Sequence, residues 1–496
     1  MEKTHNAIKI SDTDNVAIAL TGIKIDDNVL GVPAKEDILP GHKIALTDID
    51  SGEDVIKYGN PIGIATKSIS RGEFVHTHNI KTCLEGMEEY AYEPSPPTNK
   101  QPNDTQATFM GYERKNGSVG IRNEIWIINT VGCVNKIAER LAEAASIKHS
   151  DNKNIDGIYT FVHPYGCSQM GEDHVMTQKI LKGMVNHPNA AGVLVLGLGC
   201  ENNLIKDFRE FIGEYDSNRV KFFNTQDVSD EISEGLRILD GLAMYVSSYK
   251  RTIVPVSKLV LGLKCGGSDG FSGITANPLV GRLSDKLISH GGSCLLTEIP
   301  EMFGAESLIM NRAEDAEVFH KTVKLVNDFK QYYIDNNQVV YENPSPGNKE
   351  GGISTLEEKS LGCTQKGGES LVADVLDYGE QIKKPGLNLL QGPGNDIVAV
   401  TNLMAAGAHI VLFTTGRGTP LGGAVPTIKI SSNQELARTK PHWIDFDAGS
   451  LLENKSMNEL TDEFFRLVVE IASGKLTKNE ENGYREIAIF KNGVTL

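Results

Sequence analysis

The feature that most restricts how this chain can fold is a repeated pattern, in which a short aliphatic run ends in a loop of glycines and reactive side chains. The clearest copy is KLVLGLKCGGSDGFSG (258–273), whose apolar run suits a buried strand and whose loop carries a thiol and a carboxylate. Further copies are EIWIINTVGC (124–133), GIYTFVHPYGCSQ (157–169), GVLVLGLGCEN (192–202) and HIVLFTTGRGTPLGG (409–423). Open α/β sheets bind ligands at the carboxyl ends of their strands, so the pattern predicts an α/β fold with its site in these loops.

Helical segments alternate with these strands, and this alternation predicts mainly parallel sheets in two α/β domains, 108–250 and 251–496. The expected strands are 124–129, 157–162, 192–198, 220–224, 258–263, 293–297, 397–400 and 409–414. The expected helices are 136–148, 174–184, 204–215, 278–291, 314–336 and 460–473, and a loose stretch is expected at 341–355.

The first 92 residues differ from the rest, because short apolar segments alternate there with turn signals and no long helical period occurs. They predict a small all-β domain. Residues 93–107 are rich in proline and polar residues, which is typical of an extended linker. The N-terminal domain is therefore tethered, and it must dock on another part of the chain to take part in a site.

The overall charge limits the partners that this chain can have. Its 496 residues carry a net charge of −16, whereas nucleic acids and anionic membranes bind basic patches, so we expect neither as a partner. No export signal and no membrane-spanning apolar run is evident, and we expect a cytoplasmic protein. The seven cysteines then suit free thiols or metal ligands better than disulfides, and a homo-oligomer remains open.

Two histidines are candidate metal ligands. His76 and His78 lie in the expected strand 73–79, where side chains two residues apart point to the same side. Two imidazoles on one face form a plausible half of a metal site. The same pair would also suit the solvated face of a strand.

The loop HPYGCSQ offers a base and a thiol directly after a strand, in His163 and Cys167. Cys167, Cys200 and Cys265 each follow a strand and could together hold an iron–sulfur cluster, with Cys363 as a further candidate. Cysteines in such positions also occur simply as small apolar residues in a core, so both interpretations stay open.

The glycine loops also contain candidate anion ligands, Arg417 and Lys264, since a guanidinium presents paired donors to a carboxylate. No dinucleotide fingerprint and no phosphate-binding loop is present, which favours a small anionic substrate over a nucleotide. The loop that follows the expected strand 258–263 contains further candidate binding groups in Gly266, Gly267 and Ser268, and a candidate catalytic group in Asp269.

Several of these motifs resemble a known family. The first 95 residues or so resemble a SAF-type β-clip domain, through GHKIALTDI, GEDVIKYGNPIG and GEFVHTHN. The rest resembles the D-galactarate dehydratase/altronate hydrolase family, through GYERKNGSVGIRNEIWIINTVGC, HPYGCSQ, GLGCE, LKCGGSDGFSG, QGPGND and TTGRGTP. The resemblance covers nearly the whole chain. Its length and unbroken domain order are most similar to the altronate branch, with the galactarate branch and the two-chain sulfolactate sulfo-lyases as close relatives.

The resemblance implies a hydro-lyase that removes water from a sugar acid. The expected reaction is dehydration of D-altronate to 2-dehydro-3-deoxy-D-gluconate in hexuronate catabolism, with Fe²⁺ or Mn²⁺ required. Galactarate or a sulfolactate-type substrate is the alternative within the family, and a sugar-acid binding protein is the non-enzymatic alternative.

Roles for the candidate residues follow from this chemistry. His76 and His78 are expected to hold the metal, and Arg417 the substrate carboxylate. His163 is the first candidate for the base, with Lys264 as the second. A cluster on Cys167, Cys200 and Cys265 is the alternative Lewis acid.

Overall fold

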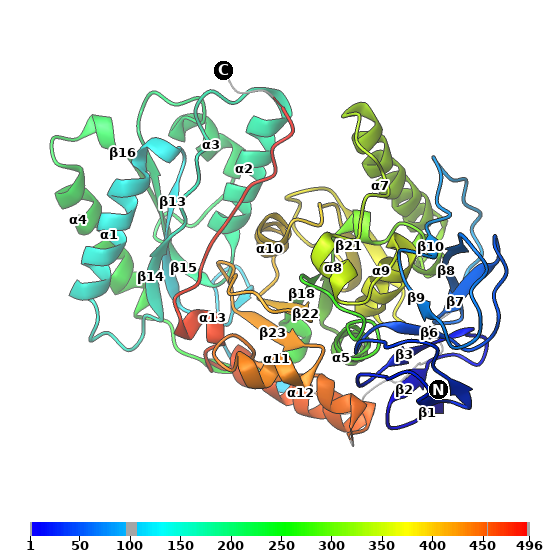
Figure 1. Ribbon diagram of the computed structural model, residues 1–496. Helices are drawn as coiled ribbons and strands as arrows, with labels where there is room; N and C mark the ends of the chain where they lie inside the picture. Colours follow the sequence, from blue (N-terminus) through cyan, green and yellow to red (C-terminus); the bar gives the residue numbers. More distant parts are fainter. Residues whose placement is uncertain (1, 96–106, 454, 494–496) are drawn as a thin grey trace.

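The computed structural model describes residues 2–95, 107–453 and 455–493. Figure 1 shows three units: a C-terminal unit lies in the middle, with a small N-terminal unit and a second unit on opposite sides of it. The expected linker 93–107 lies mostly outside the described residues. Its first residues are fastened to the C-terminal unit, where the Ser95 amide donates to the Asn311 carbonyl at 2.7 Å.

The N-terminal unit is built from short antiparallel strands and turns. Two of its sheets have the strand orders β1-β2-β3-β6-β9 and β10-β8-β7, and β4 and β5 form a hairpin. The bounds are β1 Glu2–Lys3, β2 Ala7–Lys9, β3 Val16–Ala19, β4 Asn28–Val29, β5 Val32–Pro33, β6 Lys43–Ala45, β7 Asp54–Lys57, β8 Asn60–Ala65, β9 Phe74–Val75 and β10 Ile80–Lys81. The expectation of a small β-clip domain is confirmed.

One expected strand of this unit is much shorter than the sequence suggested. β9 ends at Val75, and residues 76–79 form a turn. The Asn79 side chain closes this turn, because it accepts from the His76 amide at 2.9 Å and donates to the Phe74 carbonyl at 2.8 Å. His76 and His78 therefore lie on a turn and not on one face of a strand.

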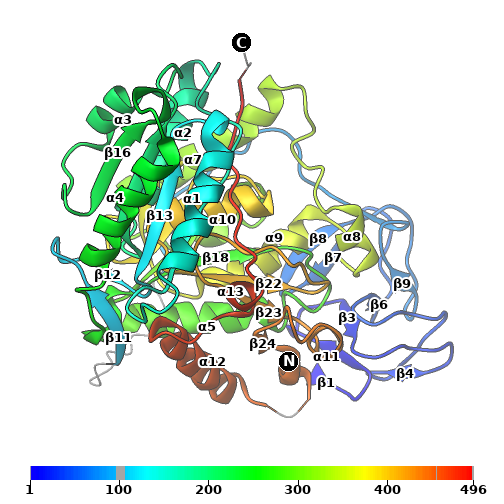
Figure 2. The ribbon, with the colours of Figure 1, turned by 90° about the vertical axis from the view of Figure 1, so that its left-hand side faces the viewer.

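The second unit is a parallel α/β sandwich with the strand order β14-β13-β15-β16. Helices α1 and α4 cover its outer face, as Figure 2 shows, and α2 and α3 cover the face toward the C-terminal unit. The bounds are β13 Glu124–Asn129, α1 Asn135–Lys148, β14 Gly157–Thr160, α2 Gly171–Asn186, β15 Ala190–Gly197, α3 Ile205–Ile212, β16 Val220–Asn224 and α4 Glu231–Val246. All eight residues of β15 are buried, which explains its unbroken apolar run.

The C-terminal unit contains a parallel sheet of seven strands in the order β20-β21-β19-β18-β22-β23-β24. Helices α5, α7 and α12 pack against one hydrophobic core, and α10 lies in the core shared with the second unit. The strands are β18 Val260–Cys265, β19 Ser293–Leu296, β20 Val372–Leu376, β21 Gly386–Leu390, β22 Ile410–Thr415, β23 Thr427–Ser431 and β24 Phe446–Asp447. The helices are α5 Ala276–Ser289, α6 Glu306–Met310, α7 Ala316–Asp335, α8 Pro346–Glu350, α9 Leu356–Thr364, α10 Asp396–Ala405, α11 Gln434–Thr439, α12 Met457–Ala472 and α13 Lys478–Glu481.

The expected strand 397–400 is wrong, because this segment lies inside helix α10. The Asn395 side chain caps this helix by accepting from the Val398 amide, and every residue from Val398 to Ala405 is buried. A helix that is buried on all sides has no amphipathic period in its sequence, so a short apolar run within it cannot be distinguished from a buried strand. In the stretch 341–355, which was expected to be loose, residues 346–350 form α8.

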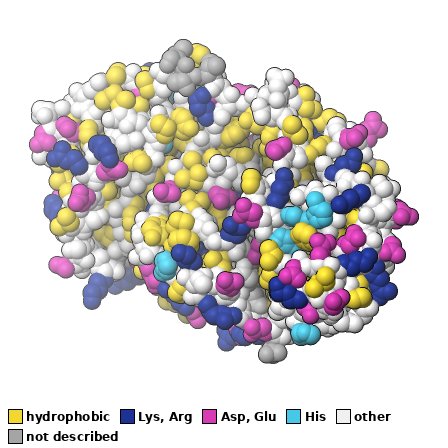
Figure 3. Space-filling view, in the orientation of Figure 1, with side chains coloured by type: hydrophobic (Ala, Val, Ile, Leu, Met, Phe, Trp, Pro, Cys, Tyr) yellow, Lys and Arg dark blue, Asp and Glu magenta, His cyan; other side chains and the backbone are white. Residues whose placement is uncertain are grey.

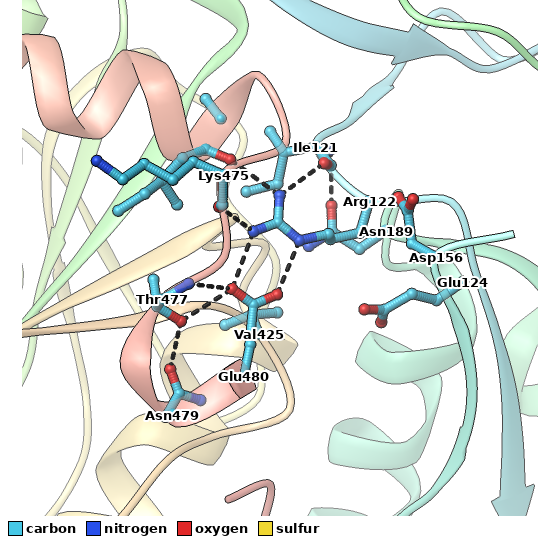
Figure 4. A network of polar contacts seen from close by, with 12 residues as sticks. Ile121, Arg122, Glu124, Asp156, Asn189, Val425, Lys475, Thr477, Asn479 and Glu480 are labelled. Atoms are coloured by element: carbon cyan, nitrogen blue, oxygen red, sulfur yellow. Dashed lines mark hydrogen bonds and ion pairs between the residues drawn. The ribbon is translucent and has the colours of Figure 1, made fainter. Parts of the chain in front are cut away.

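Two features join the second and C-terminal units. Strands β11 (Thr108–Glu113), β12 (Val119–Gly120) and β17 (Thr252–Pro255) form a small antiparallel sheet where the chain enters and leaves the second unit. Figure 4 shows the other feature, in which the Arg122 guanidinium lies between the two units. It donates to both oxygens of Glu480, at 2.8 and 2.9 Å, and to the carbonyls of Ile471 and Lys475.

No helix in the described part of the chain is long and apolar enough to cross a bilayer.

Candidate active site

The N-terminal unit docks on the carboxyl-end loops of the C-terminal sheet, and a groove of about 1020 Å³ runs along this contact. His42 lines the groove from one side, and Arg417 and Asp269 line it from the other. The two backbones approach so closely that a Cβ added to Gly270 would lie 1.9 Å from the Gly41 carbonyl oxygen. Glycine is therefore required at the contact that forms the groove.

A buried ion network holds the N-terminal unit in place. Glu358, on helix α9 of the C-terminal unit, accepts from Lys43 at 2.8 Å and from Lys57 at 2.6 Å. Burial opposes ionisation of Glu358, but the two lysines outweigh this effect and lower the pKa of the carboxyl to about 2. All three side chains are almost completely buried, so this docking contact excludes water.

The loop after β18 positions Arg417. The Gly267 carbonyl accepts from the amides of Gly416 and Arg417, both at 3.0 Å. The guanidinium donates to the Gly347 carbonyl at 3.2 Å and lies 3.3 Å from Glu350, which is 70% exposed. A partner that exposed is readily displaced, so Arg417 can turn its paired donors to a carboxylate in the groove.

Asp269 connects the groove with a small enclosed pocket behind it, since it lines both. Its carboxylate accepts from Ser432 at 2.7 Å, from Asn433 at 3.0 Å and from both the amide and the hydroxyl of Ser272. Burial raises the pKa of Asp269. With this many donors, Asp269 holds the loop after β18 in place. The Ser268 carbonyl in the same loop accepts from the Asn348 side-chain amide nitrogen at 2.8 Å, which fixes the position of Ser268 as well.

Next to the enclosed pocket lies a buried cluster of lysines and carboxylates. Lys264 contacts Glu298 and lies 2.9 Å from Asp396, and Lys366 lies 2.8 Å from the second oxygen of Glu298. Burial disfavours the charged form of Lys264, but these carboxylates outweigh it and raise the pKa. Lys264 therefore stays protonated at neutral pH and cannot act as the base that the sequence suggested.

The same cluster contains three potential metal ligands. The Sγ atoms of Cys265 and Cys363 lie 3.3 Å apart, and Glu301 Oε2 lies 3.2 and 3.4 Å from them. All three residues are buried, and among the described residues they form the one group of three or more such ligand atoms lying within 4.8 Å of one another. The other oxygen of Glu301 accepts from Lys359 at 2.9 Å.

Histidine side chains gather on one part of the molecular surface (Figure 3), and three histidines of the N-terminal unit surround the Phe74 ring. The Phe74 ring contacts the rings of His42, His76 and His78, with centroids 5.3 to 5.5 Å apart. His76 Nδ1 lies 3.2 Å from the Ser354 hydroxyl, and burial together with Lys43 lowers the pKa of His76 to about 4. His78 is exposed. The expected pair thus lies at the docking contact, although its ligand atoms do not converge with a third one from the described part of the chain.

His163, Cys167 and Cys200 belong to the second unit and do not join this site. Both ring nitrogens of His163 bond to backbone, at 2.9 Å to the Asn129 carbonyl and at 3.2 Å to the Tyr165 amide. Burial also lowers the pKa of His163. No nitrogen is left to take a proton from a substrate, so the expected role as base does not fit. Cys265 is likewise separated from Cys167 and Cys200, because it contacts Cys363 in the C-terminal unit.

Sequence reasoning missed several members of the site: His42, Glu298, Glu301, Lys359, Lys366 and Glu358. One signal was present in TLEEKSLGC, where charged residues interrupt a segment without any apolar stripe. All nine residues of the resulting helix α9 are buried, so its charges had to be paired inside the protein.

Comparison with known proteins covers the whole chain. Residues 5–83 match the altronate/galactarate dehydratase SAF domain. Residues 111–247 match the second domain of D-galactarate dehydratase/altronate hydrolase, and residues 256–495 match the C-terminal domain of D-galactarate/altronate dehydratase.

Full-length relatives include two proteins named altronate dehydratase, from Escherichia coli K12 and Bacillus subtilis 168. Each is 53% identical to this chain, with 99% of both chains covered. A galactarate dehydratase (L-threo-forming) from Escherichia coli K12 is 32% identical, with 97% of this chain and 96% of the relative covered.

Proposed function

This chain belongs to the D-galactarate dehydratase/altronate hydrolase family, and on that premise we propose that it dehydrates D-altronate to 2-dehydro-3-deoxy-D-gluconate. The observation that carries the proposal is the 53% identity over the full length with two altronate dehydratases, against 32% with a galactarate dehydratase. The two substrates differ in hydroxyl configuration and at one terminus, where galactarate carries a second carboxylate. A cytoplasmic location and a homo-oligomer stay predictions from the sequence.

The reaction removes a proton next to a carboxylate and expels a hydroxyl group, so the site needs a carboxylate clamp, a base and fixed positive charge. We assign the clamp to Arg417, which lines the groove and has an exposed, displaceable partner in Glu350. The carboxylate gains negative charge as the proton leaves, and a guanidinium that already holds it stabilises that charge.

His42 suits the role of base. Its Nδ1 lies 3.2 Å from the Pro40 carbonyl, which can only accept, so Nδ1 carries the proton and Nε2 keeps its lone pair. Burial lowers the pKa of His42, so the ring is neutral at pH 7 and can accept a proton. This assignment places the base on the N-terminal unit, in the groove that also contains Arg417.

The buried lysines are fixed cations next to the enclosed pocket, although their carboxylate partners balance their net charge. Lys264, Lys359 and Lys366 are each paired with a carboxylate and fully or almost fully buried. Such charges do not have to reorient as the reaction proceeds, which is the main advantage of a preorganised site. Lys264 then acts through its charge, in place of the proton transfer expected from the sequence.

We further propose a requirement for Fe²⁺, with Mn²⁺ as the alternative; such an ion would supply Lewis acidity for the proton removal and for the loss of the hydroxyl group. Cys265, Glu301 and Cys363 fit a metal, because their ligand atoms already converge. The charges of the three lysines cancel those of three carboxylates, Glu298, Glu301 and Asp396, when both thiols are neutral. If both thiols lose their protons, one divalent ion cancels the two added negative charges. His76 and His78 remain the alternative ligand pair.

Manganese binding separates the two ligand sets, because the paramagnetic resonance of free Mn²⁺ disappears when the ion binds. We expect Cys363→Ser and Glu301→Gln to abolish tight binding, while His76→Ala retains it. Loss of binding in His76→Ala with normal binding in Cys363→Ser would instead assign the ion to the histidines.

The activity itself is tested with purified protein, assayed anaerobically with ferrous iron on a panel of hexonates and hexarates. Release of a 2-keto acid from D-altronate, at a kcat/KM well above that for galactarate, is the expected result. Preference for galactarate would reassign the substrate. Tight binding of D-altronate without turnover would support the sugar-acid binding protein instead.

A further inference from the structure

Three exposed thiols belong to the second unit, which lies across the C-terminal unit from the N-terminal unit (Figure 1). Cys133, Cys167 and Cys200 follow β13, β14 and β15, which are neighbours in one parallel sheet in the order β14-β13-β15. Parallel strands end at the same edge of their sheet, so the three loops with their thiols share this edge. The proposed dehydration uses none of these thiols.

Each thiol directly follows a glycine, and two of these glycines let their loops approach the neighbouring loop. A Cβ added to Gly166, where φ is 97°, would lie 2.0 Å from the Thr130 carbonyl oxygen, and one added to Gly132 would lie 2.7 Å from the His163 carbonyl oxygen. Gly199, before Cys200, has a φ of 124°. Close packing of backbone therefore requires glycine at Gly166 and Gly132, and the positive φ of Gly199 favours glycine there.

Hydrogen bonds connect the loop that carries Cys167 with the loop on each side of it. The Gly132 amide donates to the Tyr165 carbonyl at 2.8 Å, which joins it to the loop of Cys133. The Ser168 amide donates to Asn202 Oδ1 at 2.7 Å, which joins it to the loop of Cys200. The three thiols are therefore presented by one rigid assembly of loops.

Buried polar side chains support this assembly from below. Glu201 accepts from the Thr130 hydroxyl at 2.6 Å and from the Gly199 amide at 2.6 Å. Asn203 donates to the Thr130 carbonyl at 3.1 Å, and His163 bonds to backbone through both nitrogens. This support accounts for the buried histidine and glutamate of the HPYGCSQ and GLGCE motifs as positioning residues for the thiols.

The spacing of the thiols determines the kind of ligand that they suit. Metal–sulfur bonds of about 2.3 Å keep two thiolates on one ion within about 4.6 Å of each other. Among the described residues, the one set of three such ligand atoms within 4.8 Å of one another is that of Cys265, Glu301 and Cys363, so the three Sγ atoms do not meet this limit together. An iron–sulfur cluster distributes its thiolates over different iron atoms, so it does not require them to meet on one ion.

We propose that Cys133, Cys167 and Cys200 bind a [4Fe–4S] cluster at this edge. Cys133 lies in the short turn that leads directly into helix α1. The other four cysteines lie in the N-terminal and C-terminal units, so one iron receives no cysteine and is open to an oxygen ligand such as water. The site differs from the set expected from the sequence, because Cys133 takes the place of Cys265.

The test is anaerobic reconstitution of the full-length protein with iron, sulfide and a thiol reductant, followed by removal of unbound ions. We expect visible sulfide-to-iron charge-transfer absorbance and about four acid-labile sulfide per chain, with about four iron from the cluster in addition to any mononuclear iron. Each of Cys133→Ser, Cys167→Ser and Cys200→Ser should lower the acid-labile sulfide at least tenfold. Cys83→Ser, which changes an exposed thiol of the N-terminal unit, is the matched control and should leave it unchanged.

Acid-labile sulfide makes this result independent of the proposed dehydration, because a mononuclear ion at Cys265 and Cys363 binds no sulfide. Wild-type protein that retains no sulfide would overturn the proposal, as would variants that retain it in full. Zinc held by these thiols without sulfide would also overturn it. Thermal unfolding of each variant shows whether the fold is intact, and exposed serines should leave it so.

Discussion

The residues of the site differ mainly in how burial and charge set their protonation. Lys264 is kept as a cation by Glu298 and Asp396, whereas burial keeps His42 neutral. Both are polar groups in the same region of the protein, yet only the neutral one can accept a proton. The chemistry available to each side chain thus depends on its neighbours more than on its type.

Replacement of His42 with Gln should lower kcat by about 100-fold or more with little change in KM, because a positioned base typically contributes 10²- to 10⁴-fold. Burial lowers the pKa of His42 below its usual 6.5, so the wild-type rate should fall only as the pH drops below that value. The rate of the variant should lack this decrease at acid pH. His5→Gln, which alters another histidine lining the groove, should retain both the wild-type rate and its decrease at acid pH.

Replacement of Arg417 with Ala should raise KM for D-altronate by about 10- to 100-fold, since a hydrogen bond to a charged group contributes about 1.5–3 kcal/mol. Steady-state kinetics over a range of substrate concentrations measure the change. Arg438→Ala is the control, because Arg438 lines the same groove but donates to Gln434. An equal effect of both substitutions would indicate general attraction of the anion and not a specific clamp.

At the scale of elements, helix α9 and the strands of the N-terminal unit depend on each other. Glu358 of α9 neutralises Lys43 at the start of β6 and Lys57 at the end of β7. Neither element could bury these charges without the other. The docking of the N-terminal unit is therefore part of the folding of the C-terminal unit.

Replacement of Glu358 with Gln should lower stability by about 3–5 kcal/mol at neutral pH, because it leaves two buried lysines without their carboxylate. The folded pKa of about 2 lies below the ordinary 4.5, so the stabilisation is complete above pH 4.5 and is lost as the pH falls toward 2. Calorimetry across this range should show a steeper acid loss for wild type than for Glu358→Gln. Glu317→Gln, in an exposed pair, should change little.

The sequence predicted the elements better than it predicted the site. Strands with long aliphatic runs were found, and the expected strand 124–129 coincides with β13. Helix α10 was misread, because burial on all sides removes the amphipathic period that distinguishes a helix. The partners of Lys264 could not be found, since Glu298 and Asp396 are distant in sequence and meet it only through the order of the strands.

For the molecule as a whole, the second and C-terminal units form one cooperative body. The two units share a hydrophobic core, and the end of the chain returns to the second unit, where Ile487 and Ile489 join that core. Arg122 and Arg485 add buried ion pairs across the same boundary, with Glu480 and Glu124. Such a boundary should not open without global unfolding.

Replacement of Arg122 with Met should therefore lower the free energy of unfolding by about 3–5 kcal/mol, because it leaves Glu480 buried with fewer partners. The melting temperature of both units should fall together. Calorimetry should show one transition for wild type and variant. Arg237→Met, on an exposed helix surface, is the control and should melt like wild type. Separate transitions for the two units would contradict a shared cooperative body.

The docked N-terminal unit has a practical consequence for anyone who handles this protein. Its hold on the rest relies on buried charges and closely packed glycines, none of which requires the peptide bonds of residues 96–106. Protease cleavage within that segment should yield two fragments on a denaturing gel that still elute together from a sizing column and keep their catalytic rate. Adding Glu358→Gln should let the small fragment separate, so preparations that look homogeneous by size alone can contain nicked chains.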